Sequence, residues 1–374
     1  MKIPGFLHRS PPLEADVAVV GSGLPALAAA LELSRRGPKV VVLGAAPAEE
    51  RPLGLGLALL GPGRPYTQVA RAIGRSEARL VWAAGCENHL RLRSLVDETR
   101  RDCGYALRGS FLLARDRAEA VELAESEDLL RDDGFPGEFL DHYMLETRFD
   151  LSGFAGAYWA AEDAEIDGLR LLGLLGEWAR AAGIGFEPGP VRGVLAEASG
   201  VAIETPEGTV RAGAAVVATD GVAGGLVPEL RPLLRPASRA RLRTPLLPGA
   251  VLPTAVRTAD GRMAWQRGER EVVLAETGPA EGSPSGALEA FATRIPVEAA
   301  SARWDEEGEV SADGLPLVGR LSGRPLAVAC GFGALCPGLA FAAARWVADA
   351  LLTGADPTPE PLRATRPPRG DASV

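Results

Sequence analysis

The segment between Asp16 and Gly44 restricts the fold of this chain more than any other. A short apolar run, residues 16–20, precedes the turn Gly21-Ser-Gly-Leu-Pro-Ala26. Apolar residues then recur at helical spacing over residues 24–36, and residues 40–43 form a second apolar run. Such runs are typical of strands buried in a parallel sheet. The segment therefore predicts a strand–turn–helix–strand unit at the start of an α/β domain.

The turn has the glycine spacing of a dinucleotide-binding site. Gly21 allows the tight turn, Gly23 lets the backbone approach a pyrophosphate, and Ala26 lets the helix pack closely on the strand. Free N–H groups and the positive dipole end at the helix N-terminus favour phosphates. A tight turn without a ligand is the alternative, and two glycines so placed between a strand and a helix disfavour it. The predicted cofactor-binding residues here are Gly21, Gly23, Leu24, Pro25 and Ala26.

The second strand lacks the acidic residue that usually follows it in such units. An Asp or Glu there accepts hydrogen bonds from the adenosine ribose, whereas this chain has Gly44. Loss of a charge-assisted hydrogen bond of this kind costs about 1.5–3 kcal/mol of affinity. Glu49, Glu50 or a backbone carbonyl are the candidates for compensation. We therefore expect a weaker ribose contact than usual.

Composition limits the classes of function. The 374 residues suffice for two domains, or for one large α/β domain with an inserted sheet. The net charge of −9 argues against a nucleic-acid partner, because no basic face is evident to neutralise phosphates. The four cysteines and three histidines show no spacing typical of a metal site, and sparse cysteines fit a reducing cytoplasm. No secretory signal or membrane span is evident. We expect a cytoplasmic protein without a metal.

The end of the chain has the same pattern as its beginning. Residues 325–330 are predicted to form a buried strand, residues 331–338 a glycine-rich turn and residues 339–352 a closing helix. Another buried strand, residues 214–218, runs into Thr219. Further helices are predicted over 67–100, 118–133 and 169–182, and strands over 191–196, 201–205, 210–212, 255–258 and 272–276. Residues 45–65 are predicted to be a long loop, which is usually functional.

Six segments, taken in order, resemble a known family of flavoproteins. They are residues 16–43, GLGLALLGPGRPY (54–66), DCGYALRGSFLLA (102–114), VVATDG (216–221), Trp304 with DGLPLVG (313–319), and CGFG (330–333). The chain resembles the FAD-dependent oxidoreductases of the D-amino-acid oxidase and glycine oxidase type. It is nearer in style to the γ-glutamylputrescine oxidase and sarcosine oxidase branch.

The resemblance implies an α/β (α+β) fold, in which a Rossmann-like FAD-binding domain is interleaved with an antiparallel-sheet substrate domain. Residues 15–85, 145–225 and 305–354 would form the FAD-binding domain, residues 86–144 and 226–304 the substrate domain, and residues 355–374 a proline-rich tail. The implied reaction is oxidation of a small-molecule amine or amino acid. A hydride passes from the carbon next to nitrogen to flavin N5, and the resulting imine hydrolyses. Homo- or hetero-oligomers occur among such proteins.

The resemblance also adds residues to the predicted FAD site. They are Gly44, Gly54, Gly56, Thr219, Gly331, Phe332, Gly333, Ala334 and Leu335. The N-terminus of the closing helix would stabilise negative charge on reduced flavin. Cys330 and Cys336 flank the expected flavin position; we favour buried apolar roles for them over a covalent link. No catalytic residue is assigned, since the cofactor carries the chemistry and the protein supplies orientation.

Departures from the family pattern leave a second hypothesis open. Ala334-Leu-Cys-Pro337 replaces a His-containing turn, and Gly308 stands where glycine oxidase-like proteins have a carboxylate-binding Arg. The acidic run 305–309 would repel a carboxylate, although such runs are usually solvated loops. Arg257 and Arg262 are alternative anion-binding candidates, with surface roles the commoner interpretation. The second hypothesis is a degenerate subunit that keeps the flavoprotein fold for assembly. An NAD-dependent enzyme ranks last, because it gives the C-terminal motifs no role.

Overall fold

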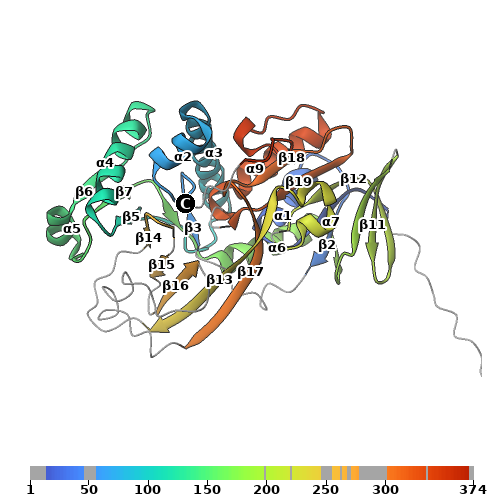
Figure 1. Ribbon diagram of the computed structural model, residues 1–374. Helices are drawn as coiled ribbons and strands as arrows, with labels where there is room; N and C mark the ends of the chain where they lie inside the picture. The colour runs from blue at the N-terminus through green and yellow to red at the C-terminus, as the bar shows by residue number, and fades with distance from the viewer. Residues whose placement is uncertain are drawn as a thin grey trace, which may run out of the picture.

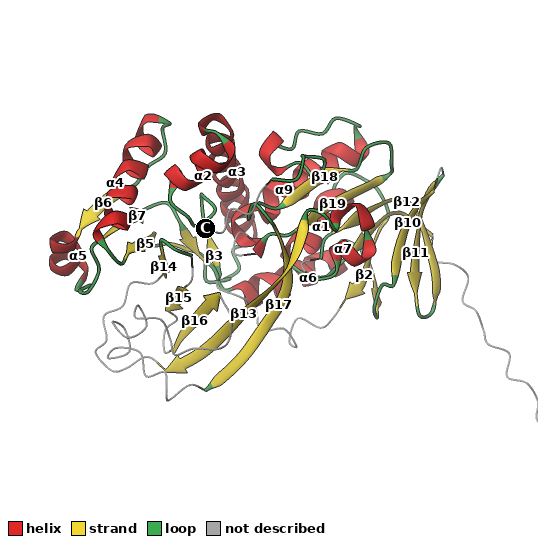
Figure 2. Ribbon diagram, in the orientation of Figure 1, coloured by secondary structure: helices red, strands yellow, loops and turns green. Residues whose placement is uncertain are grey.

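The computed structural model describes residues 14–45, 56–197, 199–219, 221–245, 255–261, 263–267, 271–277, 301–333 and 336–369. Two eight-stranded sheets stand side by side, with a small three-stranded sheet between them (Figure 1). Helices cover the first sheet and the far end of the second (Figure 2). This arrangement confirms the predicted fold class, a Rossmann-like unit interleaved with a second sheet.

Five parallel strands, in the order β19-β12-β1-β2-β9, form the centre of the first sheet. Their bounds are Leu326–Cys330, Gly208–Val217, Glu14–Val20, Val40–Ala45 and Gly185–Pro188. The first half of β12 also pairs antiparallel with β11 (Gly200–Thr205), which pairs with β10 (Gly193–Glu197). β18 (Leu317–Arg320) is antiparallel to β19. The predicted strands 210–212 and 214–218 are thus one continuous strand.

Three helices cover one face of this sheet: α1 (Leu24–Ser34), α6 (Gly168–Ala181) and α9 (Cys336–Leu352). α1 lies against both α6 and α9. Alanines on α1 and α9 are fully buried, and their small side chains let the helices and the sheet pack closely. The opposite face of the sheet packs against β10, β11 and α7 (Ala223–Leu226). Within the described residues, no helix combines the length and apolarity needed to cross a membrane.

The second sheet has the strand order β17-β13-β16-β15-β14-β5-β7-β6. In that order the bounds are Ala302–Ser311, Leu234–Pro245, Glu271–Thr277, Met263–Arg267, Ala255–Thr258, Ser110–Ala114, Gly156–Ala160 and Glu138–Asp141. All neighbours are antiparallel except β14 and β5. The outer face carries an apolar cluster around Phe111, Val256 and Trp265, which packs against α5 (His142–Phe149).

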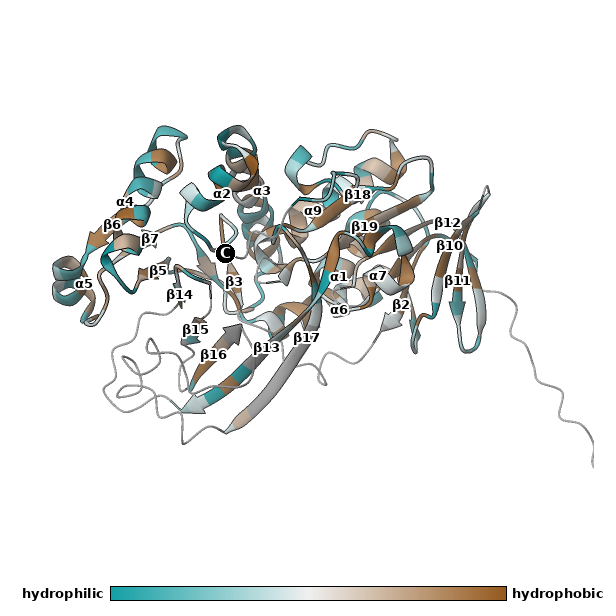
Figure 3. Cartoon of the chain, in the orientation of Figure 1, coloured by the Kyte–Doolittle hydropathy of each residue, from teal (hydrophilic) through white to brown (hydrophobic). Residues whose placement is uncertain are grey.

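The remaining elements connect the two sheets. The predicted helix 67–100 is two helices, α2 (Tyr66–Ile73) and α3 (Arg75–Thr99), because Gly74 has a φ of +95° and interrupts it. α4 (Arg117–Asp132) begins at Asp116, whose side chain accepts from the Glu119 N–H. In Figure 3 α4 carries both hydrophilic and hydrophobic stretches, as expected of a helix with one buried face. The small sheet consists of β3 (Leu57–Ala58), β8 (Ala164–Glu165) and β4 (Ala106–Leu107).

The proline-rich C-terminal segment packs against the first sheet as far as residue 369. The Ala364 N–H donates to the Val318 carbonyl of β18, and Leu362 is fully buried. Arg366 pairs with Asp313 through two hydrogen bonds of 2.8 and 3.0 Å and also donates to the carbonyls of Leu315 and Pro316. Burial raises the pKa of Asp313, but the Arg366 hydrogen bonds and charge outweigh it, so this pKa lies below its ordinary value of 3.8.

We expect Arg366→Met to lower the free energy of unfolding by about 3–5 kcal/mol at neutral pH, because it leaves the buried Asp313 with only the longer ion pair to Arg369, at 3.7 Å. The pair stabilises the fold fully above pH 3.8 and loses this contribution as pH falls through the lowered pKa of Asp313. Urea unfolding of both proteins should therefore show a difference that shrinks at acidic pH. Arg363→Met, which leaves the pair intact, is the control. An unchanged difference at every pH would contradict the assignment.

Candidate functional site

The carboxyl ends of β1, β2, β12 and β19 lie together at one edge of the first sheet. They are parallel and in register, because Val20 pairs with Leu43 and Val217, and Val217 pairs with Val328. Four predicted segments lie at these strand ends: 21–26 follows β1, Gly44 is the penultimate residue of β2, Thr219 lies two residues after β12, and 331–333 follows β19. The structure therefore brings them to the edge at which parallel α/β sheets bind their ligands.

Gly21 begins the turn after β1. Its N–H donates to the Leu43 carbonyl at 2.9 Å, and its φ of +125° favours glycine. A Cβ at this position would lie 2.1 Å from the Ala218 carbonyl oxygen. α1 then starts at Leu24 with Gly23 as its N-cap and Pro25 in its first turn. The first N–H groups of a helix have no partner inside it, so this turn presents donors at the sheet edge.

The space in front of Gly23 and the hydroxyl of Thr219 decide whether this edge can accept a pyrophosphate. A Cβ on Gly23 would meet only the Pro25 Cδ, at 3.7 Å, so the space in front of its backbone is open. The Thr219 hydroxyl is buried, and no hydrogen-bond partner for it is found among the described residues. An open glycine backbone, helix N–H groups and an unpaired hydroxyl form a suitable donor set for phosphate oxygens. The residues present therefore fit the pyrophosphate of a dinucleotide.

Gly44 differs from an ordinary strand-end position in its backbone as well as its side chain. It lies at an irregularity in the pairing of β2 with β9, and its φ is +78°. A Cβ there would lie 3.9 Å from the Gly189 carbonyl and the Val191 side chain. Space exists, but the left-handed backbone disfavours any non-glycine residue. Gly189 and Val191 carry no sequence signal of a site and were not predicted.

Residues 56–63 lie between α9 and the second sheet. The Gly56 N–H donates to the Gln266 side chain of β15 at 2.7 Å. A Cβ on Gly338 of α9 would lie 2.6 Å from the Leu59 carbonyl, and one on Gly61 would meet the Trp82 ring at 2.3 Å. The loop therefore packs against the α9 N-terminus on one side and the second sheet on the other. Gly54 lies outside the described residues.

The α9 N-terminus is held by Asn88 of α3, a residue with no exposed surface. Its amide nitrogen donates to the Pro337 carbonyl at 2.9 Å, and its amide oxygen accepts from the N–H groups of Phe341 and Ala342. α9 begins three residues earlier than predicted, because Pro337 is favoured in a first helical turn. Gly331 and Gly333 both have positive φ, and Phe332 is buried. Ala334 and Leu335 lie outside the described residues.

A buried polar cluster joins the loop to the second sheet. The Asp163 carboxylate accepts from the Leu60 N–H at 2.8 Å and from the Ser110 hydroxyl at 2.5 Å. Arg257 lies 3.9 Å from the same carboxylate. His89 is buried nearby, and burial lowers its pKa, so it is neutral. The sequence singled out Arg257 only; Arg262 lies outside the described residues.

Tyr158 donates to the Pro136 carbonyl at 3.0 Å, and burial raises its pKa, so it stays protonated.

At the end of the acidic run 305–309, Glu309 accepts from the Gly224 N–H at 3.1 Å, which is a structural contact with α7. Gly308 pairs with Ala237 inside the sheet. The side chains of residues 305–307 are not described.

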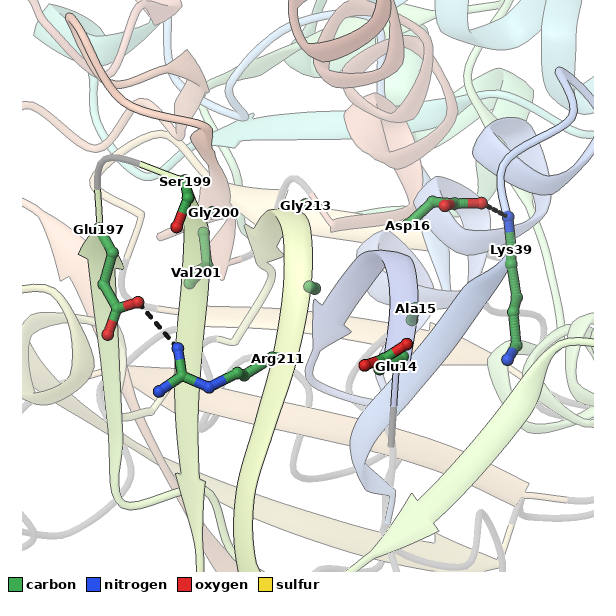
Figure 4. Close-up of a pocket in the computed structure, with 11 residues that line it drawn as sticks. Glu14, Ala15, Asp16, Lys39, Glu197, Ser199, Gly200, Val201, Arg211 and Gly213 are labelled. Atoms are coloured by element: carbon green, nitrogen blue, oxygen red, sulfur yellow. Dashed lines mark hydrogen bonds and ion pairs between the residues drawn. The ribbon is translucent and has the colours of Figure 1, made fainter. Parts of the chain in front are cut away.

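A cavity of about 440 Å³ lies at the edge of the first sheet opposite the glycine turn (Figure 4). Its lining includes the charged residues Glu14, Asp16, Lys39, Glu197 and Arg211. The Asp16 carboxylate accepts from the backbone N–H of Lys39 at 2.7 Å, and the Arg211 guanidinium pairs with the Glu197 carboxylate at 2.9 Å. This open, polar region faces away from the glycine turn and is not part of the candidate site.

A family model described as "FAD dependent oxidoreductase" (DAO) matches residues 16–350. The chain belongs to this family of FAD-dependent oxidoreductases. Membership confirms the predicted family and FAD as its cofactor. Curated protein sequences contain no significant match to this flavoprotein.

Solved structures share the fold of this flavoprotein over nearly its whole length. Glycine oxidase from Geobacillus kaustophilus is 22% identical with a TM-score of 0.75, covering 95% of this chain and 99% of that one. L-Proline dehydrogenase from P. horikoshii is 18% identical with a TM-score of 0.74, covering 93% and 96%. L-Amino acid deaminase from Proteus vulgaris is 15% identical with a TM-score of 0.76, covering 97% and 99%.

The two glycines of the turn should respond differently to the same added methyl group. Gly23→Ala has an allowed φ of −77° and open space, so it should cost the fold about 1 kcal/mol at most. It should weaken FAD binding by about tenfold or more, since the methyl occupies space in front of the donors. Gly21→Ala should lower stability by about 2 kcal/mol or more through backbone strain and collision.

Thermal unfolding of the apoprotein and FAD titration by flavin fluorescence separate these two effects. Unchanged FAD affinity in Gly23→Ala would place the pyrophosphate elsewhere.

Restoring an acid at position 44 should fail. Gly44→Glu should lose about 1–2 kcal/mol of stability, because its backbone has a φ of +78°, and should not tighten FAD binding. Gly44→Ala is the matched control and should lose as much, since the strain comes from the backbone. Thermal unfolding and FAD titration measure both. A gain in FAD affinity for the Glu variant alone would show that the carboxylate finds the ribose after all.

Proposed function

We propose that this flavoprotein oxidises the C–N bond of an amine or amino acid to an imine, which then hydrolyses. The observation that carries the proposal is the convergence of the glycine turn, the Thr219 hydroxyl and the α9 N-terminus with an interior cluster of the second sheet. When bound, FAD supplies a hydride acceptor at flavin N5. The named substrates of glycine oxidase, L-proline dehydrogenase and L-amino acid deaminase support an amino acid substrate.

In this proposal the chain's own residues bind the cofactor, orient it and exclude water. The turn at Gly21 and Gly23, with Thr219, holds the pyrophosphate. The α9 N-terminus, held by Asn88, directs its positive end toward negative charge that develops during reduction. Leu60 and Trp82 contribute apolar surface to the adjoining cavity. No side chain needs to act as an acid or base in this scheme, because positioning and electrostatics supply the catalysis.

A degenerate subunit with an assembly role is the second candidate. Gly44 supports it, because this position lacks the ribose-binding acid and its φ of +78° disfavours a non-glycine residue there. The oligomeric state and the cytoplasmic location stay predictions.

The purified chain should show the visible absorption of oxidised flavin, or gain it when FAD is added. Anaerobic addition of a panel of amino acids and amines should bleach this absorption for at least one compound, because its hydride reduces the flavin. A colourless protein that gains no flavin absorbance would refute the enzyme proposal. Flavin that is bleached only after a second chain is added would favour the subunit.

A further inference from the structure

Arg257 occupies the inner face of the second sheet, toward the flavin-binding part of the chain. It pairs with Leu112 on β5 and Ala264 on β15, whereas its neighbour Val256 lies in the apolar cluster of the outer face. The position that a Cβ on Gly63 would take is 2.1 Å from one Arg257 terminal nitrogen, so the guanidinium lies directly against the 56–63 loop. A charged side chain is thus fixed between two apolar layers.

The guanidinium is buried without being satisfied. One terminal nitrogen lies 3.4 Å from the Ser110 hydroxyl and 3.9 Å from the Asp163 carboxylate. Its Nε and its other terminal nitrogen are buried and have no partner among the described residues. A well-formed charge-assisted hydrogen bond is about 2.7–2.9 Å long. Burial lowers the pKa of Arg257, but an arginine remains protonated in proteins.

Asp163 does not neutralise Arg257 well, because its two oxygens serve other donors. One accepts the Leu60 N–H and the other the Ser110 hydroxyl, both at shorter distances than the arginine. A purely structural ion pair would place the carboxylate against the guanidinium, since an unpaired buried charge costs several kcal/mol. The arrangement instead holds a cation beside a carboxylate and leaves donors unpaired.

Arg257 lines a cavity of about 30 Å³, together with apolar groups of Leu60 and Trp82 and with the polar side chains of Tyr158, Ser110 and Asp163. This is room for one or two water-sized groups, such as the oxygens of a carboxylate. Among the described residues of the lining, the one other cation is Arg64, which donates to the Asp313 carbonyl at 3.0 Å. Arg257 is therefore the lining cation with buried nitrogens that have no partner among the described residues.

We infer that Arg257 binds the carboxylate of the substrate, and that Ser110 and Asp163 are positioning residues for its guanidinium. The inference rests on the proposed function, because it identifies that substrate as an amino acid rather than a simple amine. In glycine oxidase-like proteins the carboxylate-binding arginine stands at the position that corresponds to 308, where this chain has a glycine in β17. The inference assigns carboxylate binding to β14 instead. A carboxylate supplies both the negative charge and the hydrogen-bond acceptors that the buried nitrogens lack.

The test compares carboxylate binding among matched variants of the FAD-loaded protein. Benzoate is titrated while flavin absorbance is followed, and the same titration is repeated by calorimetry. Arg257→Met should raise the benzoate dissociation constant by about 10–100-fold, as expected for loss of a hydrogen bond to a charged group. Arg257→Lys should restore part of the affinity. Arg64→Met, which removes the other cation of the cavity, should change it by less than about threefold.

The thermal midpoints of the variants distinguish carboxylate binding by Arg257 from a purely structural role. Arg257→Met replaces an unsatisfied buried charge with an apolar chain of similar length, so its thermal midpoint should stay the same or rise. Ser110→Ala should weaken benzoate binding while Arg257 is still present, because the guanidinium loses a positioning contact. Unchanged benzoate affinity in Arg257→Met, with or without a lower midpoint, overturns the inference.

The two proposals fail in different ways. If the wild-type protein takes up no FAD, the proposed function fails, and calorimetry of benzoate against wild type and Arg257→Met still decides the anion site. If FAD is bound and reduced by a substrate while Arg257→Met leaves benzoate affinity and KM unchanged, only the carboxylate assignment fails.

Discussion

The parallel pairing of β1 between β2 and β12 is the constraint on which the rest of the site depends. It fixes the height at which each strand ends, and so the positions of Gly21, Gly44 and Thr219 relative to one another. Gly21 is held on both sides, by its hydrogen bond to Leu43 and by its close approach to Ala218. A side chain at Gly21 would push β12 away and displace Thr219 with it.

Close packing extends this constraint to the C-terminal half of the site. α1 and α9 lie against each other through buried alanines, so the N-termini of both helices lie near the same sheet edge. Asn88 then fixes the first turn of α9 from α3, and Gly338 presses on the Leu59 backbone. Because Gly338 approaches the Leu59 backbone and the two helices meet through alanines, small residues are needed at these contacts. The loop 56–63 is positioned by this packing.

Sequence reasoning predicted the parts of the site that follow local rules. The glycine turn, the strand-terminal position of Thr219 and the glycines at 331 and 333 each follow a buried strand, and parallel strands bring such positions together. The family resemblance placed them in the right order. Helix boundaries at Gly74 and Cys336 were missed, because one depends on a backbone φ and the other on proline in a first turn. The domain boundaries stay predictions.

The Asp163 cluster could not be predicted from the sequence, and the reason is physical. Its members come from β5, β14 and the segment between β7 and β8, and nothing in their local patterns distinguishes Arg257 from the many surface arginines of this chain. Only the pairing of β14 with β5, at a parallel junction in an otherwise antiparallel sheet, brings Arg257 beside Ser110.

That junction gives the inner face its asymmetry. Directly paired residues share a face of a sheet, so Arg257, Ala264 and Ala275 lie in one row across β14, β15 and β16. The row continues through the buried Arg241 on β13 to Trp304 on β17. The alanines on β15 and β16 place only small side chains between these two arginines.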